Sequence, residues 1–386
     1  MVAGAEGVAR SGAPLRIALL GGGTVGREVV RGLLDPQGQL IEVSPKLELV
    51  GVAVRDVAKA IASGIPEGLL TDAPAHLVAS PDTDLIVEVM GGDEPSHMLL
   101  RAALGAGKAV VTANKHVIAH YGAELEGVAR ASGAALRFEA AVGGGIPVLS
   151  PLANDLAANR FREIRGIVNG TTNFILTAMH QIGQSYEDAL ADAQEAGLAE
   201  ADPSADVEGI DAANKLAILI RLAFGTWVDP ESIDRRPSMA SGGEGLPGIT
   251  GVTAADVAEA MGAGGAIKLV ARAEHRKTRT GQDDGITAAV VPTFVRALDS
   301  LARVNGTDNR VEIQGTPIGG VAFEGPGAGG RATSSAVLAD ILAIARGAGS
   351  TWGALRAASG TVEAIEPTSR EVHDGPSGAR YPVSSS

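Results

Sequence analysis

The sequence predicts an α/β fold with more than one domain, and three observations lead to this class. Short apolar runs typical of buried strands alternate with helical patterns over residues 15–142, as in a parallel sheet covered by helices. From about Phe161 the order changes to one strand-like run, then helices, then four further strand-like runs, which indicates a second, α+β domain. With 386 residues, the chain is long enough to bury two such cores.

The composition narrows the function classes. With 45% hydrophobic and 20% charged residues, the chain has the make-up of a soluble globular protein. A net charge of -13 and an aromatic content of 3% argue against a nucleic-acid or membrane partner. The sequence has neither an apolar core of signal-peptide length nor a membrane-length apolar run, so we expect a cytoplasmic location. Because the sequence lacks cysteine, thiolate metal sites and thioester-forming enzymes are excluded.

The first strand-like run, Leu15–Leu20, leads into the glycine turn GGGTVG and then into a helical pattern. Glycines at this spacing let the backbone approach a pyrophosphate, and the helix that follows offers unpaired N–H groups. The alternative is a purely structural turn, but the strand before it and the helix after it favour a Rossmann-type dinucleotide site. The cofactor-binding residues expected here are Gly21, Gly23, Thr24, Val25 and Gly26.

The second strand-like run ends at Val54 and is followed by Arg55, Asp56 and Lys59. At this strand end an acidic residue bonds the ribose 2′-hydroxyl of NAD, whereas an arginine accommodates the 2′-phosphate of NADP. Arg55 comes first and Lys59 adds a second positive charge, so the sequence favours NADP. Asp56 leaves NAD open as the alternative.

Two further strand ends carry candidate site residues. One run is closed by Gly91, and the next ends just before Lys115. Ligands of open α/β sheets bind beyond the carboxyl ends of the strands, so Lys115 lies where chemistry would take place. The alternative is a solvated lysine at the start of a helix, which is an electrostatically poor place for a cation. His116 and His120 are four residues apart on that helix, but no third ligand is nearby, and a polar helix face is favoured over a metal pair.

The stretch 196–215 gathers five carboxylates and one lysine between two helical segments. Gly197 is expected to end the first helix, and Asp206 to cap a second helix over about 207–224. Asp211 and Lys215 are four residues apart and therefore share a helix face. They could be a surface pair worth a few tenths of a kcal/mol. However, the apolar run that follows Lys215 predicts a partly desolvated lysine, suited to proton transfer or anion binding.

The two ends of the chain and a third glycine loop complete the pattern. The loop GPGAGG precedes a helical segment and suits either an anionic ligand, with Gly327 as a contact, or a tight connection. Residues 1–14 read as a mobile arm, and the Ser/Pro/Gly-rich tail beyond about Gly360 is expected to be disordered.

Seven blocks, in order over about residues 15–348, together resemble the homoserine dehydrogenase family. They are GGGTVG, EVMGGDEP, VVTANK, FEAAVGGGIP, GIVNGTTNFIL, the stretch 196–215 and GPGAGGRATSSAVLADI. The resemblance implies reversible NAD(P)H-dependent reduction of L-aspartate 4-semialdehyde to L-homoserine by direct hydride transfer, in threonine and methionine biosynthesis. Another two-domain amino-acid dehydrogenase would not require the stretch 196–215. A catalytically silent nucleotide-binding regulator would have no reason to keep its acids and lysines together.

The resemblance also implies the domain plan and a homodimer. A nucleotide-binding domain is expected over 15–147 and a substrate and dimerisation domain with a mixed sheet over 148–325. A helix over 326–348 would return to the first domain, and 349–386 would form a C-terminal segment. Since this segment is too short for the regulatory domain of some relatives, weak inhibition by threonine is expected.

By their positions in these blocks, individual residues take expected roles. Lys215 matches the lysine assigned to proton transfer, and Lys115 is expected close to the reacting oxygen. Glu200 matches the carboxylate that holds the substrate's amino group. Further substrate contacts are expected from Asp206, Asp211, Gly170 and Thr171. A monovalent cation, usually sodium in the family, would be held by backbone carbonyls near Glu139, Val142 and Gly144.

Overall fold

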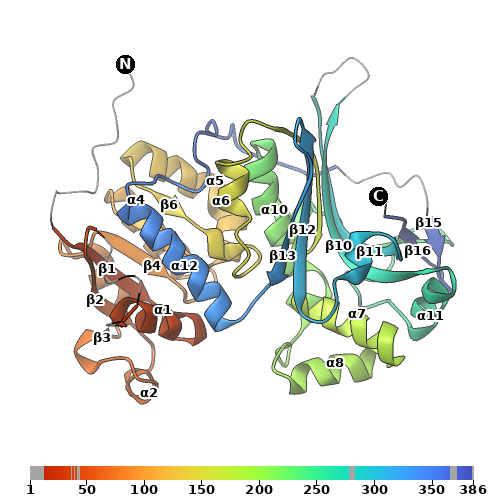
Figure 1. Ribbon diagram of the computed structural model, residues 1–386, viewed down its shortest axis with the longest axis horizontal. Coiled ribbons are helices and arrows are strands. Elements are labelled where there is room, and N and C mark those ends of the chain that lie inside the picture. The colour runs from red at the N-terminus through yellow and green to blue at the C-terminus, as the bar shows by residue number, and fades with distance from the viewer. Residues whose placement is uncertain are drawn as a thin grey trace. The chain divides into compact units, whose positions relative to one another are not determined.

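The computed structural model describes residues 13–35, 37–38, 40, 44–277, 283–365 and 372–384, which divide into two compact units (Figure 1). Unit 1 consists of Met1–Asp155 and Ala328–Ser359, and unit 2 of Leu156–Gly327 and Gly360–Ser386. The domain boundaries expected at 147 and 325 therefore fall at 155 and 327. Most of the arm expected over 1–14 lies outside the described residues. None of the described helices is long and apolar enough to span a membrane.

Unit 1 is a doubly wound domain on a parallel sheet of strand order β3-β2-β1-β4-β5-β6. This order confirms the Rossmann-type prediction. The strands are β1 (Leu15–Leu20), β2 (Leu47–Ala53), β3 (Leu70–Thr71), β4 (Leu85–Glu88), β5 (Ala109–Thr112) and β6 (Leu136–Arg137). The helices are α1 (Thr24–Leu34), α2 (Val57–Ala62), α3 (Pro74–Ala79), α4 (Ser96–Gly105), α5 (Lys115–Ser132), α6 (Leu149–Ala153) and α12 (Gly330–Ala345).

The core of unit 1 explains why its central strands could be predicted. Helices on both faces of a parallel sheet bury every residue of a central strand, so these strands are continuous apolar runs. Ile17, Leu19 and Val87 are completely buried in one cluster. Val337 and Ile341 of α12 join the same cluster, and Figure 1 shows this late helix beside α1. Helix α12 thus packs into the core of unit 1 although it follows unit 2 in the chain.

Unit 2 contains a five-stranded sheet of order β11-β10-β7-β12-β13. All its described pairings are antiparallel, so the mixed sheet predicted for this domain is wrong. Two hairpins flank β7, and strands joined by short hairpin connections must run antiparallel. The strands are β7 (Arg160–Ile167), β10 (Gly265–Lys277), β11 (Asp283–Arg296), β12 (Asp308–Thr316) and β13 (Gly319–Pro326). The helices are α7 (Gly170–Ile182), α8 (Tyr186–Glu195), α9 (Ser204–Val207), α10 (Ile210–Phe224) and α11 (Ala254–Gly262).

Two predicted elements differ in the structure. The last strand of the pattern that reaches residue 142 is shorter than its apolar run: β6 ends at Arg137, and Glu139–Ala141 form a 3-10 helix. The Glu139 carboxylate accepts the N–H groups of the first turn of α6, which pulls this segment away from the sheet. The single helix expected after an Asp206 cap is two helices, because Gly209 adopts a left-handed φ of +78° between α9 and α10.

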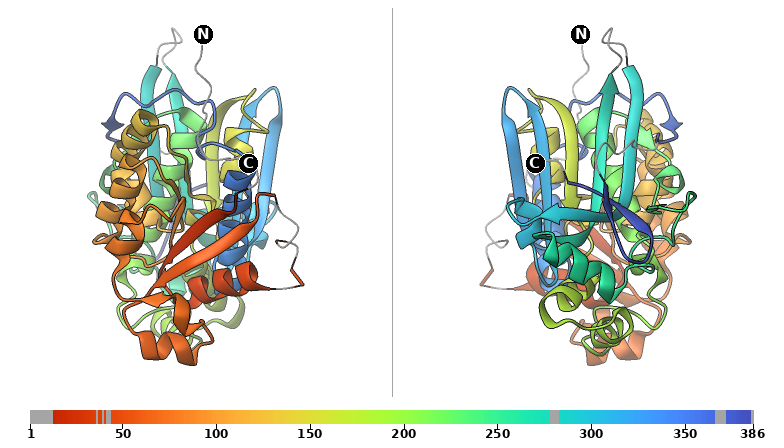
Figure 2. Two further views of the ribbon diagram at one scale, coloured as in Figure 1. Left: turned by 90° about the vertical axis from the view of Figure 1, so that its left-hand side faces the viewer. Right: turned by 90° about the vertical axis from the view of Figure 1, so that its right-hand side faces the viewer.

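The C-terminal tail, expected to be disordered, forms strands in its described residues. Strands β15 (Val372–Asp374) and β16 (Ala379–Pro382) pair with each other, and β16 also pairs with β9 (Ser238–Met239). Tyr381 of β16 is completely buried. Backbone bridges join Ile365 and Val383 to β11, an edge strand of the five-stranded sheet. Figure 2 shows the late strands, in dark blue, against this sheet. The Ser/Pro/Gly-rich composition predicted disorder, but a few buried side chains such as Tyr381 are enough to hold these strands against the sheet.

Candidate functional site

The glycine turn of unit 1 has the geometry of a dinucleotide fingerprint. Gly21 has a φ of +110°, and a Cβ there would lie 2.8 Å from the Val89 carbonyl oxygen. A Cβ on Gly26 would overlap the Gly21 oxygen, so this glycine allows α1 to pack closely on the turn. A Cβ on Gly23 would meet no atom within 4 Å. The middle glycine therefore faces open space, where a pyrophosphate can approach the N-terminus of α1, formed by Thr24 and Val25.

Asp56, which follows the end of β2, caps the next helix, α2. Its carboxylate accepts the Lys59 N–H at 2.9 Å and so caps α2. Arg55 and Lys59 are exposed beside it. Asp56 is exposed as well, but its Oδ1 atom is engaged as the cap of α2, whereas Arg55 and Lys59 present two positive charges at this strand end.

The carboxyl ends of β4 and β5 carry the other expected residues of unit 1. Gly91 has a left-handed φ of +74°. Lys115 is the half-buried first residue of α5, which Asn114 caps by accepting the Val117 N–H at 3.2 Å. The rings of His116 and His120 stack at 4.1 Å, and His116 Nε2 lies 2.8 Å from Asp93. Within the described residues, no group of three or more potential metal-binding side chains is assembled.

The expected cation region lies between β6 and α6. Gly143 and Gly144 both have left-handed φ values, which turns successive peptide groups in this loop. Burial raises the pKa of Glu139, neighbouring Asp340 raises it further, and three N–H groups of residues 148–150 counteract the rise. The Glu139 carboxylate is therefore engaged by N–H groups. Because this carboxylate is occupied, the ligands left for a cation at this loop are backbone carbonyl oxygens. The sequence predicts those near Glu139, Val142 and Gly144.

The acidic stretch of unit 2 forms a compact cluster around the first turn of α10. Lys215 Nζ lies 2.7 Å from Asp211 Oδ2 and donates to the Val168 carbonyl oxygen at 2.6 Å. Asn169 Nδ2 donates to Asp206 Oδ1 at 2.7 Å and to Asp211 Oδ2 at 2.9 Å. Only 10% of the Lys215 side chain is exposed, so the desolvated environment predicted for it is confirmed. The interpretation of Asp211 and Lys215 as a mere surface pair is excluded.

Asn169 is the site residue that sequence reasoning missed. It caps α7 by accepting the Thr172 N–H at 2.8 Å. Its amide nitrogen also bridges two aspartates that lie 37 and 42 residues later in the chain. No local pattern encodes such a contact. The signal in the sequence is its position directly before Gly170 and Thr171, the turn that the family resemblance marks as a substrate contact.

The remaining expected residues of unit 2 lie around this cluster. Gly170 begins α7, and a Cβ there would lie 2.8 Å from the Thr307 carbonyl oxygen. The Thr171 hydroxyl donates to the Leu198 carbonyl oxygen at 2.9 Å, which ties α7 to the acidic loop. Glu200 lies exposed in that loop. A Cβ on Gly327 would overlap the amide of the completely buried Asn309, so packing alone already requires this glycine.

A second buried lysine in unit 2 gives a prediction about pH. Lys268 is 2% exposed and donates to Asn173 Oδ1 at 3.0 Å and to the Val304 carbonyl oxygen at 2.6 Å. Burial lowers the pKa of Lys268 to about 8. Burial also lowers the pKa of His180, and the Lys268 charge adds to that shift. Since the unfolded lysine keeps its ordinary pKa, the unfolded chain binds more protons above pH 8, and stability contributed by this group rises with pH.

We therefore expect Lys268→Met to flatten the stability profile above pH 8. In the wild type, the Lys268 contribution to the free energy of unfolding should rise by about 2 kcal/mol from pH 8 to pH 10. Urea denaturation at several pH values measures the difference in slope between wild type and variant. Replacing the exposed Lys46 by methionine should leave the slope unchanged. Parallel profiles for wild type and Lys268→Met would contradict the assignment.

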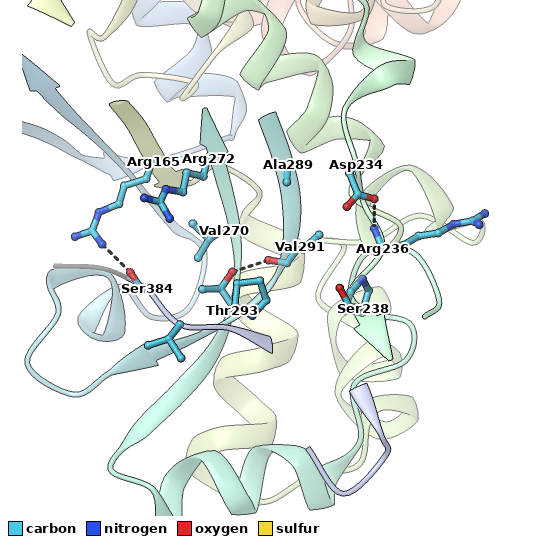
Figure 3. A pocket seen from close by; sticks show the side chains of 13 residues that line it. Arg165, Asp234, Arg236, Ser238, Val270, Arg272, Ala289, Val291, Thr293 and Ser384 are labelled. Carbon is cyan, nitrogen blue, oxygen red and sulfur yellow. Dashed lines mark hydrogen bonds between the residues drawn. The ribbon is translucent and has the colours of Figure 1, made fainter. Parts of the chain in front are cut away.

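A pocket of about 70 Å³ lies on one face of the unit 2 sheet, under the C-terminal segment (Figure 3). Arg165, Thr293 and Ser384 are among the residues that line it. On β11 the lining residues are Ala289, Val291 and Thr293, whereas Val290 between them points to the other face of the sheet, toward the start of α10. The pocket is therefore on the opposite face from the Lys215 cluster. Arg165 donates to Asp299 at 2.8 Å, to Glu312 at 2.9 Å and to Ser384 at 2.7 Å. Its guanidinium is thus engaged within the fold.

Comparisons with known proteins agree along the chain. A family model for the NAD binding domain of homoserine dehydrogenase matches residues 21–139, and one for homoserine dehydrogenase matches 147–342. The homoserine dehydrogenase of Corynebacterium glutamicum is 44% identical over 336 residues, 87% of this chain and 73% of that protein. A solved homoserine dehydrogenase from Thiobacillus denitrificans has a TM-score of 0.79 and 39% identity, covering 86% of this chain and 74% of that one. A hyperthermophilic archaeal homoserine dehydrogenase in complex with NADPH has a TM-score of 0.68 and 28% identity, covering 86% and 97%.

The glycine fingerprint in its strand–turn–helix setting, together with the NAD-binding match, makes this chain an NAD(P)-dependent oxidoreductase. The second family model and the relatives define the kind of oxidoreductase more narrowly. The chain belongs to the homoserine dehydrogenase family, whose reaction interconverts L-aspartate 4-semialdehyde and L-homoserine with a nicotinamide cofactor. The predicted family and reaction are confirmed.

Proposed function

We propose that Lys215 is the proton-transferring residue of this homoserine dehydrogenase and that Lys115 acts on the same reacting oxygen. When bound, the nicotinamide cofactor supplies or accepts the hydride. During reduction C4 of the aldehyde becomes an alkoxide, which a cationic lysine stabilises and protonates. In the direction of homoserine oxidation, a neutral lysine accepts the hydroxyl proton. The observation that carries this proposal is the buried Lys215, held between Asp211 and the Val168 carbonyl oxygen.

The acids around Lys215 hold the substrate in this proposal. Glu200, which is exposed in the loop before α9, receives the substrate's amino group. Asp206 and Asp211 complete the acidic pocket and are themselves oriented by Asn169. Gly170 and Thr171 form the substrate-contacting turn at the start of α7. Fixed carboxylates suit an ammonium group because charge-assisted hydrogen bonds are the stronger kind.

Steady-state kinetics with homoserine and each cofactor test these roles. Wild type, Lys115→Ala and Lys215→Ala are compared, with thermal melting as a check on folding. Both variants should lose turnover, while glutamate and other amino acids should not replace homoserine as substrates. Variants that both kept wild-type turnover would rule out the proposed chemistry. Oxidation of another amino acid at its C–N bond would instead favour a different amino-acid dehydrogenase.

The preferred cofactor in this proposal is NADP, with NAD as the weaker alternative. Support comes from the exposed Arg55 and Lys59 and from the use of Asp56 as a helix cap. We expect Arg55→Ala to raise KM for NADP about tenfold while changing KM for NAD little, because a phosphate contact is lost that NAD never makes. Replacing Lys46, which precedes the other end of β2, is the matched control. Equal effects on both cofactors would overturn this assignment.

Three further features complete the proposal. A sodium ion binds carbonyl oxygens near Glu139, Val142 and Gly144, where its charge would favour the ionised carboxylate of Glu139. Thermal melting in sodium chloride against tetramethylammonium chloride tests this without reference to activity, since only the smaller cation should raise the melting temperature.

The protein acts in the cytoplasm as a homodimer without nucleic-acid or membrane partners. Light scattering of the purified chain measures the oligomeric state.

A further inference from the structure

Glu88, the last residue of β4, is a completely buried carboxylate held by four donors. Its Oε1 atom accepts the N–H groups of Met90 at 2.8 Å and Gly91 at 3.2 Å, and the Ser96 hydroxyl at 3.3 Å. Its Oε2 atom accepts the Thr112 hydroxyl at 2.6 Å. A buried carboxylate is costly unless hydrogen bonds replace its water, and here both oxygen atoms are engaged.

These bonds form part of a closed ring that joins two neighbouring strand ends. The Thr112 hydroxyl, besides donating to Glu88, accepts the Asn114 N–H at 2.9 Å. The Asn114 side-chain nitrogen donates to the Gly92 carbonyl oxygen at 2.7 Å. Gly92 follows the backbone groups that donate to Glu88. The ring therefore ties the turn after β4 to the turn after β5, directly at the carboxyl edge where ligands of such sheets bind.

The bonds that reach position 88 from Met90, Gly91 and Thr112 all require an acceptor there. The Thr112 oxygen accepts the Asn114 N–H, and its own hydrogen is donated to Glu88 Oε2. The Met90 and Gly91 N–H groups are donors as well. A glutamine at this position would aim its NH2 group either at Thr112, leaving the hydroxyl hydrogen without an acceptor, or at the two N–H groups. Glutamine therefore cannot preserve the ring despite its equal size.

We infer that Glu88 is a positioning residue for the dehydrogenase reaction, which fixes the Gly91 turn and the start of α5 in one geometry. Lys115 is the residue that α5 presents at this edge, and Asn114 both caps α5 and belongs to the ring. The inference rests on the proposed roles of Gly91 and Lys115. Glu88 acts through these two groups, so its loss should affect dinucleotide binding and turnover while sparing the homoserine contacts of unit 2.

The test compares Glu88→Gln, Thr112→Val and Thr112→Ser with Lys115→Ala in steady-state kinetics. Glu88→Gln and Thr112→Val should lower kcat by about 10²-fold, the cost of a misplacement near 1 Å, and raise KM for NADP. KM for homoserine should stay near the wild-type value. Thr112→Ser keeps the hydroxyl that Thr112→Val loses, so its kcat and its KM for NADP should stay near the wild-type values. The matched control is Glu126→Gln, a buried carboxylate on α5 that pairs with Arg130 at 2.8 Å, which should change neither parameter.

A double variant separates positioning from general damage. If Glu88 acts through Lys115, then Glu88→Gln should lower kcat much less in the Lys115→Ala background than in the wild type. Full multiplication of the two effects would overturn the inference, as would wild-type kinetics for Glu88→Gln or equal losses in Glu126→Gln. If one of these outcomes is found while Lys115→Ala has lost turnover, the Glu88 inference is wrong but the proposed function still holds. Wild-type turnover in Lys115→Ala would instead refute the role of Lys115 and the inference that rests on it.

Discussion

Replacing Lys215 by alanine should lower kcat for homoserine oxidation by about 10²- to 10⁴-fold, the usual contribution of a positioned acid–base group. The side chain is buried, ion-paired with Asp211 and bonded to the Val168 carbonyl oxygen, so water cannot easily take its place. Because a neutral amine must accept the hydroxyl proton, wild-type oxidation should accelerate toward alkaline pH. Stopped-flow or steady-state rates between pH 6 and pH 10 measure both effects.

Lys215→Arg is the informative companion to the alanine variant. Arginine keeps a positive charge beside Asp211, so the fold and the acidic cluster should survive, but a guanidinium does not release its proton in this pH range. Turnover should therefore stay low although the melting temperature is preserved. Wild-type turnover with arginine, or a rate independent of pH in the wild type, would show that proton transfer does not depend on this lysine.

Replacing Arg165 by methionine should destabilise unit 2 by about 3–5 kcal/mol at pH 7, because removing one partner strands buried opposite charges. Burial alone would raise the pKa of Asp299, but hydrogen bonds from Arg165, the Leu301 N–H and Ser384 outweigh it and lower the pKa. Burial would likewise raise the pKa of Glu312, and bonds from its neighbours, Arg310 and Arg165 among them, lower it. Urea denaturation followed by circular dichroism measures the loss.

The pH dependence of that loss follows from the lowered pKa values. A carboxylate with a depressed folded pKa contributes stability above its unfolded pKa, near 4, and this contribution disappears as pH falls through the folded value. The gap between wild type and Arg165→Met should thus be constant from pH 7 to about pH 5 and shrink below about pH 4. Arg162→Met is the matched control on the same strand, since 75% of the Arg162 side chain is exposed. Equal losses in both variants would contradict the argument.

Much of the architecture was readable from local sequence patterns. The strands of unit 1 are apolar runs because helices cover both faces, and the Gly21 turn was recognisable because its glycines are required by close backbone approach. Lys215 was predicted to be buried from the apolar run behind it, and the structure confirms this. In each case the signal is a local pattern, an apolar run or a glycine spacing, so a single sequence contains it even where the packing partner is distant, as Val89 is for Gly21.

The errors and omissions concern contacts between distant residues. The antiparallel order of the unit 2 sheet depends on which strands lie beside β7, and the strand patterns alone carry no pairing information. Glu139 lies outside β6 because its carboxylate accepts N–H groups around residue 149. Asn169 and Glu88 each bond groups beyond their own element, so neither stood out in its local context. Helix α10 begins at Ile210 and not at about residue 207, because Gly209 with its left-handed φ interrupts the predicted helix.

The position of the C-terminal segment has a practical consequence for handling the protein. An uncovered edge strand offers a row of free backbone groups to other chains, and natural proteins shield such edges. Here Ile365 and Val383 bridge to β11, while Tyr381 is buried beside it. A chain shortened before residue 372 would lose part of this shield. It should therefore tend to aggregate through β11 even where its catalytic residues are intact, so loss of activity on truncation need not indicate a catalytic tail.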